Sequence, residues 1–172
     1  MDFGPRPADY RNAWSYAVSQ DTGHFKACRQ LAMQYLEGKM EPPQGCTLGD
    51  TVHALMLRAA DNGDVTAHWY IGLWHLERGE GGGPVLPVDE GETYATMAIA
   101  WLEAGRRLCD HGTILRTEEA LNRLAGIYEF GIGNIPINHA AARSVYAQMI
   151  SERFWPENEA YRRAYDRMSR NL

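Results

Sequence analysis

The sequence contains little of what common catalytic and metal-binding motifs require. Its three cysteines, Cys28, Cys46 and Cys109, lie far apart and form no Cys-x-x-Cys pair. A zinc ribbon and a disulfide framework are therefore both disfavoured, and a reduced chain is expected. No Gly-x-Ser-x-Gly, His-Glu-x-x-His or P-loop motif occurs, and each of those chemistries depends on its residues standing at that spacing. We therefore expect no catalytic residue, no metal site and no cofactor.

The histidines and glycines that are present do not change this expectation. His68 and His75 are seven residues apart, which on a helix separates them by about 10 Å along the axis, too far for one ion. We expect His75 to pack in the core instead. The glycines at 79–84 lack the lysine of a phosphate-binding loop and indicate a turn. Carboxylates are plentiful enough to form an acid–base pair in the fold, so an enzyme with an unrecognised active site stays a less favoured alternative.

Long apolar runs and an excess of positive charge are also missing. No stretch approaches the roughly 18 apolar residues of a membrane span. The opening MDFGPRPADY has no signal-peptide pattern, which favours a cytoplasmic location. The net charge is −5, so nucleic acid and anionic membranes are not expected as partners. With 172 residues and 45% hydrophobic content, the chain suits one domain or one short repeat array.

What the sequence does contain is a helical hairpin, in residues 120–146. An alanine, Leu124 and Tyr128 recur at spacing four, which places them on one face of a helix. Gly131 can adopt the left-handed backbone that ends a helix. Asn138 is a suitable N-cap for a second helix, whose inward stripe holds alanine, valine and tyrosine. Such a unit cannot bury its apolar face alone, so we expect neighbouring copies of it.

The same pattern occurs at two earlier places, with the closing glycine of the second copy one residue late. In the order alanine, leucine or isoleucine, small residue, ring and closing glycine, the copies are Ala27, Leu31, Ala32, Tyr35 and Gly38; Ala67, Ile71, Gly72, His75 and Gly79; and Ala120, Leu124, Ala125, Tyr128 and Gly131. Recurrence of a two-helix unit at fixed offsets is typical of a helical solenoid.

We therefore predict an all-α fold, an α/α solenoid in which about three hairpins form a superhelical stack with capping helices. The expected parts are an irregular N-terminus (1–8), then a single repeat domain (9–172) with a leading half-repeat (9–20), hairpins at about 24–61, 64–109 and 118–153, and a capping helix (156–170). Its Tyr161, Ala164, Tyr165 and Met168 should cover the open end. The inserted segment 80–92 is rich in glycine, proline and acidic residues, which exclude both helix and central strand.

The repeated pattern resembles a known family. The signature A-x3-L-[GA]-x2-Y-x2-G-x-G, a turn, A-x2-[WV]-Y and the link from Ala59 to Ala67 are similar to the Sel-one-like repeat (SLR), a relative of the tetratricopeptide repeat. The resemblance covers about residues 15–153. His75 departs from it by replacing the tyrosine, and Met40 by standing where a glycine is expected. The resemblance implies stacked helical hairpins and a role in protein assemblies, but it names no chemistry.

In stacked hairpins the first helices line a concave face, and their positions outside the core point into it. By offset from the repeated alanines, the residues predicted to bind a partner are Lys26, Arg29, Met33, Trp69, Leu73, Glu77, Asn122, Arg123, Glu129 and Phe130, with Glu37, Thr66 and Glu119 at the same offsets. Arginine, tryptophan and methionine on one face are typical of protein contacts. For Trp69 and also for Trp74, a place in the core is an equally good interpretation.

The function that the sequence favours is non-enzymatic binding of a partner protein through the concave face and the inserted segment 80–92. A short acidic chain of this kind could neutralise a bacterial effector, as an immunity protein blocks its toxin, or serve as its chaperone. The alternative is a general signalling or assembly adaptor with several weak partners.

Overall fold

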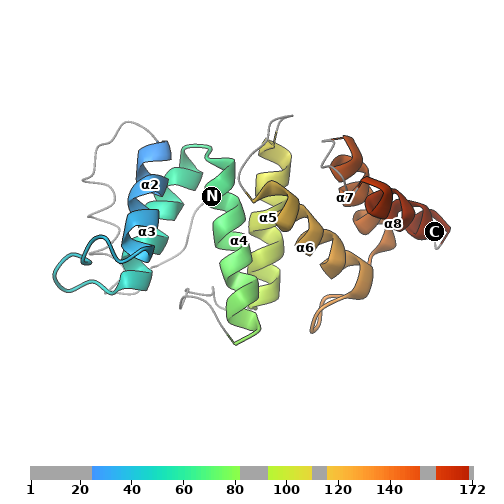
Figure 1. The fold of residues 1–172 in the computed structure, drawn as a ribbon. Helices are drawn as coiled ribbons and strands as arrows, with labels where there is room; N and C mark the ends of the chain where they lie inside the picture. The colour runs from blue at the N-terminus through green and yellow to red at the C-terminus, as the bar shows by residue number, and fades with distance from the viewer. Residues whose placement is uncertain (1–24, 82–92, 110–115, 152–157, 171–172) are drawn as a thin grey trace.

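A computed structural model describes residues 25–81, 93–109, 116–151 and 158–170, and these parts of the chain are helical (Figure 1). The helices are α2 (Phe25–Leu36), α3 (Leu48–Asp61), α4 (Val65–Gly79), α5 (Tyr94–Leu108), α6 (Thr117–Phe130), α7 (His139–Ser151) and α8 (Asn158–Arg170). Apart from one isolated bridge between Ile132 and Ile135, the described residues contain no strand pairing. The all-α prediction is confirmed.

Several predicted segments lie outside the described residues. These are the irregular N-terminus 1–8, the leading half-repeat 9–20, most of the inserted segment 80–92, and the ends of the third hairpin and start of the capping helix at 152–157.

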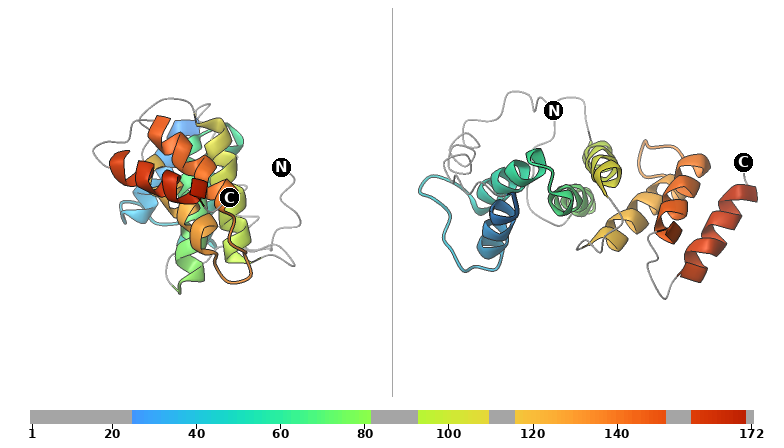
Figure 2. Two further views of the ribbon diagram at one scale, coloured as in Figure 1. Left: turned by 90° about the vertical axis from the view of Figure 1, so that its right-hand side faces the viewer. Right: turned by 90° about the horizontal axis from the view of Figure 1, so that it is seen from above.

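Consecutive helices pack against each other: α2 on α3, α4 on α5, α6 on α7, and α8 on α7. The first three pairs fall within the residue ranges predicted for the three hairpins, except that α6 begins one residue earlier. Seen from above, the pairs follow one another from α2 and α3 at one end to α8 at the other (Figure 2). The first helices of neighbouring pairs also meet, since α4 contacts α6 as well as α5.

Short polar residues and glycines set the helix ends. The Asp64 side chain accepts from the backbone N–H of Ala67 at the start of α4, and Thr93 forms a capping box with Thr96 at the start of α5. Gly131 ends α6 with φ 73°, and an added Cβ there would lie 2.8 Å from a backbone oxygen. The Asn138 side chain accepts from the N–H of Ala141. The predicted caps at Gly131 and Asn138 are therefore confirmed.

The buried apolar residues form two clusters, and both α4 and α5 contribute to each of them. One cluster joins α2, α3 and Trp101 of α5 to one side of α4, where Tyr70 and Ile71 lie. The other joins the opposite side of α4, including Leu76, to α5, α6, α7 and α8. Most of α4 is therefore buried all round, as expected for a helix in the middle of a larger core.

The ring position of the repeat and the last helix pack as the sequence predicts. His75 is fully buried, in the place where the other two hairpins have Tyr35 and Tyr128. On α8, Tyr161 and Met168 are buried in the second cluster. This helix therefore covers the second cluster at that end of the described chain.

Candidate functional site

Three of the residues predicted to bind a partner are buried and cannot line a surface. Trp69 is 0% exposed and Leu73 packs beside it in the second cluster. Glu129 is also buried. These three assignments are wrong. The offset rule assumed that one face of every first helix is open, whereas α4 lies between two clusters and has no open face along most of its length.

The environment of these residues explains why each is inside. The indole N–H of Trp69 donates to Thr117 Oγ1 at 3.1 Å, so its polar atom is satisfied. The Glu129 carboxylate accepts from Tyr146 Oη at 2.7 Å and from Arg167 Nε at 3.0 Å. Burial, together with the hydrogen bond to Glu129, raises the pKa of Tyr146, so its hydroxyl stays a donor. Glu129 thus ties α8 to the third hairpin.

The residues predicted on α2 contribute to the structure rather than to an open face. Arg29 Nε donates to Asp64 Oδ2 at 2.8 Å, and that carboxylate is the N-cap of α4. Met33 packs against the first cluster. The side chain of Lys26 lies outside the described residues. Among the further residues at these offsets, Thr66 is buried, while Glu37 is exposed and pairs with Lys39 at 2.5 Å.

The remaining predicted residues gather where α4 and α6 meet. A cleft of about 260 Å³ opens there. Its lining residues are Leu76, Glu80, Asn122, Arg123, Gly126, Ile127, Phe130, Gly131 and Ile132. Asn122, Arg123 and Phe130 were predicted from the sequence, and half-buried Glu77 lies one turn before Glu80 on α4. Phe130 is 72% exposed, the highest value among the exposed large hydrophobic side chains of the described residues.

The rim of this cleft carries one charged pair, and a second pair lies nearer the start of α6. Arg123 on α6 bonds to Glu80 at the end of α4. On the same side of α6, Arg116 bonds to Glu119 at 2.8 Å, and its guanidinium lies 4.8 Å from the centroid of the Tyr70 ring. These pairs are partly exposed, so each contributes little stability and can be exchanged for a partner's charge.

Sequence reasoning missed Gly126 and Ile132 as parts of this cleft. Glu80 is predicted to bind only as the first residue of the inserted segment 80–92, not as a residue of the helical face. Gly126 carried a usable signal, because it stands at the same offset from its repeated alanine as Met33 and Leu73. Where the other two copies have a large side chain, the third copy has none.

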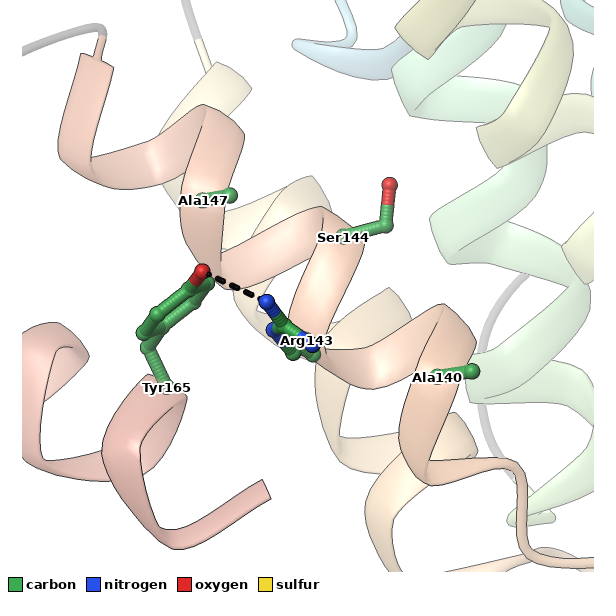
Figure 3. Close-up of a pocket in the computed structure, with 5 residues that line it drawn as sticks. All are labelled: Ala140, Arg143, Ser144, Ala147 and Tyr165. Atoms are coloured by element: carbon green, nitrogen blue, oxygen red, sulfur yellow. Dashed lines mark hydrogen bonds between the residues drawn. The ribbon is translucent and has the colours of Figure 1, made fainter. Parts of the chain in front are cut away.

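A second cleft, of about 290 Å³, lies between α7 and α8 (Figure 3). Its lining is Ala140, Arg143, Ser144, Ala147 and Tyr165. Arg143 and Tyr165 point toward each other, with Arg143 Nη2 donating to the tyrosine hydroxyl at 3.1 Å. Ser144 accepts from Arg106 at 2.5 Å. Because these polar groups are already bonded within the chain, this cleft is best explained as a seam of helix packing.

His75 is the histidine whose pKa burial clearly changes, and it lines neither cleft. Burial lowers the pKa of His75 to about 4, so the ring is neutral near pH 7. Neither ring nitrogen has a hydrogen-bond partner among the described residues. Its ring lies 6.5 Å from that of His53 and 6.2 Å from that of Tyr94. A perturbed histidine without access to a cleft does not nominate a catalytic base.

Within the described ranges, no three histidine, cysteine or acidic side chains come together as a metal site would require. None of the helices described has both the length and the apolar content needed to cross a membrane. No protein-family model, curated protein or solved structure matches this chain.

Proposed function

We propose that this protein is a non-enzymatic interaction module that binds a partner protein at the cleft between α4 and α6. The observation that carries the proposal is the exposed Phe130 beside an apolar cleft with a charged rim. Interfaces are typically centred on an aromatic anchor and surrounded by polar groups that exclude water. The predicted residues that support this site are Asn122, Arg123 and Phe130, with Glu77 at its edge.

The architecture that we propose with this function is an SLR-type α/α solenoid. In-register repeats in the sequence support it, as does the packing of consecutive helix pairs. In such a stack the first helices are rigid, so a partner binds with little loss of conformational freedom. The sequence also predicts that the inserted segment 80–92 takes part in binding, and its first residue, Glu80, lines the cleft.

Within this function we favour a dedicated cytoplasmic partner of a bacterial effector, either an immunity-type inhibitor or a chaperone. A neutralising protein needs a single tight interface, and the chain offers one cleft with an aromatic anchor among its described residues. The alternative is an adaptor with several weak partners. An enzyme with an unrecognised active site is less favoured, since the perturbed His75 lines neither cleft.

The test is affinity capture of the tagged protein from a lysate of its own cells, comparing the wild type with Phe130→Ser. Leu108→Ser is the matched control, because Leu108 is an apolar side chain on α5 that is 50% exposed and lies outside the cleft. The wild type and the control should retain a partner that Phe130→Ser loses.

The strength of that interaction then separates the two roles. One partner bound one-to-one with nanomolar affinity supports an inhibitor or chaperone, whereas several partners of micromolar affinity support an adaptor. If Phe130→Ser captures the same partner as well as the wild type does, the cleft is not the binding site. Absence of any specific partner would refute the interaction function itself.

A further inference from the structure

Gly126 leaves a gap in the α4–α6 cleft that nothing in the described chain fills. It lies inside α6, where the backbone is helical, and a Cβ added to it would meet no atom within 4 Å. Neither a turn nor close packing therefore requires glycine here, although glycine weakens a helix relative to alanine. Gly72 and Gly105 differ, since a Cβ at either would come within 2.8 Å of a neighbouring side chain.

Comparison with the other two copies of the repeated pattern shows which kind of side chain is absent at position 126. Met33 and Leu73 occupy the same offset in the first two hairpins, and both pack against core clusters. In the third hairpin the corresponding space is open to the surface and forms part of the cleft. The gap therefore lies where the other two copies have a large apolar side chain. A side chain of another molecule can fill it.

The walls of the gap are apolar. Leu76, Ile127 and Ile132 line it, and Phe130 stands exposed beside it. At about 260 Å³ the cleft is smaller than the roughly 300–1,000 Å³ typical of small-molecule sites. An apolar side chain projecting from a protein surface fits both its size and its lining.

The charges around the gap favour a basic neighbour for that side chain. Glu80, which lines the cleft, is 53% exposed and bonds to Arg123. Such a surface pair can be exchanged for a partner's charge. The chain as a whole carries −5. This overall excess of negative charge attracts a cationic segment.

We propose that the cleft over Gly126 receives one large apolar side chain of a partner protein, and that a lysine or arginine next to it in the partner pairs with Glu80. This inference rests on the proposed function, because it specifies the partner's chemistry at the same site. The apolar side chain would contact Ile127 and Phe130 and replace the side chain that Gly126 lacks.

The test is a titration of the ¹⁵N-labelled protein, followed by NMR, with soluble Gly/Ser peptides that carry a central Lys-Phe-Lys, Lys-Ala-Lys or Glu-Phe-Glu. We expect Lys-Phe-Lys to shift the amide signals of Gly126, Ile127 and Phe130 in a saturable way. Lys-Ala-Lys should bind at least about tenfold more weakly, since it buries no large side chain. Glu-Phe-Glu should also bind more weakly, because it meets like charge.

Gly126→Met is the matched variant, since it fills the gap from within on a backbone that accepts any side chain. We expect it to lose the response to Lys-Phe-Lys while keeping its helical circular dichroism spectrum. If that variant does not fold, the comparison of Lys-Phe-Lys with Lys-Ala-Lys in the wild type carries the same test.

Absence of saturable shifts with Lys-Phe-Lys would overturn the inference, and so would equal or tighter binding of Glu-Phe-Glu. These outcomes leave the proposed function standing if a captured partner is still lost from Phe130→Ser. If no partner is captured at all, the proposed function fails first. The two failures can therefore be distinguished.

Discussion

At the scale of single residues, three glycines inside helices have opposite surroundings. An added Cβ at Gly105 would lie 2.8 Å from the Trp69 ring, and one at Gly72 would lie 2.7 Å from Leu102 Cγ. These two glycines allow α4 and α5 to approach closely. Gly126 has open space above it instead, so its glycine costs helix stability without a packing benefit inside the chain.

We predict that Gly126→Ala raises the free energy of unfolding by about 1 kcal/mol, because alanine is the better helix former and meets no obstacle. Gly105→Ala should lower it, by about 1–3 kcal/mol, because the methyl group must displace the Trp69 ring. Urea denaturation followed by circular dichroism measures both. A loss of stability in Gly126→Ala would show that the space over this residue is not open in solution.

His75 gives the protein a pH dependence with a definite sign. Burial lowers its pKa from 6.5 to about 4, so the unfolded chain takes up a proton here at a higher pH than the folded chain does. The free energy of unfolding should therefore fall as the pH drops from about 6.5 to about 4, and this group should contribute no further change above that window. The difference between the two pKa values corresponds to about 3 kcal/mol.

The measurement is urea denaturation at several pH values between about 7.5 and 4, with His75→Phe as the comparison. Phenylalanine keeps a ring against His53 and Tyr94 but cannot titrate. The variant should lose less stability on acidification than the wild type, whatever its stability near neutral pH. Parallel curves for the two proteins would rule out this role of His75.

At the scale of helices, Asp64 holds the start of α4 and joins it to α2. Its carboxylate accepts from the N–H of Ala67 at 3.2 Å and from Arg29 Nε at 2.8 Å, while only 4% of its side chain is exposed. The glycine before it, Gly63, has φ 86°, so the turn from α3 into α4 depends on a left-handed residue. One carboxylate thus serves both as a helix cap and as a link between the first two hairpins.

We predict that Asp64→Ala lowers the free energy of unfolding by about 2–4 kcal/mol, since it removes a cap and a charge-assisted hydrogen bond. Asp64→Asn should cost clearly less, because an amide oxygen can still accept from Ala67. The two variants can be compared by thermal and urea denaturation. Equal losses would mean that the ion pair with Arg29, not the cap, accounts for the effect.

Much of the helical organisation could be predicted from sequence, because it depends on local chemistry. Leu124 and Tyr128 share a helix face through their spacing, and Gly131 and Asn138 mark the turn through backbone and side-chain preferences. The state of Trp69 could not be predicted in this way. Its burial depends on which helices cover α4 on both sides. That is a property of the packed chain and not of the residues next to Trp69 in the sequence.

The candidate site was predictable only in part for the same reason. Asn122, Arg123 and Phe130 lie on α6, and their offsets placed them on an open face. Glu129 is also predicted on the open face of α6, yet α8 packs over it and its carboxylate is buried and bonded to Arg167. Long-range packing of the last helix decided that difference.

At the scale of the whole molecule, α4 contributes buried side chains to both clusters along most of its length. Tyr70 and Ile71 face the first cluster, while Trp69 and Leu73 face the second. Because α4 packs in both clusters, a change on this helix should affect the helices on both sides of it. A change at an exposed residue near the end of α6 should not affect both clusters in this way.

We therefore predict that Trp69→Ala lowers the free energy of unfolding by about 3–5 kcal/mol, the usual cost of removing a large buried ring. Phe130→Ala should change it by no more than about 0.5 kcal/mol, because that side chain is 72% exposed. Native-state hydrogen exchange should show the loss in Trp69→Ala for amides of α3 as well as α7, since α4 packs on both groups of helices. If α3 kept its full protection while α7 lost it, the two clusters would unfold independently, and α4 would not couple the two ends of the chain.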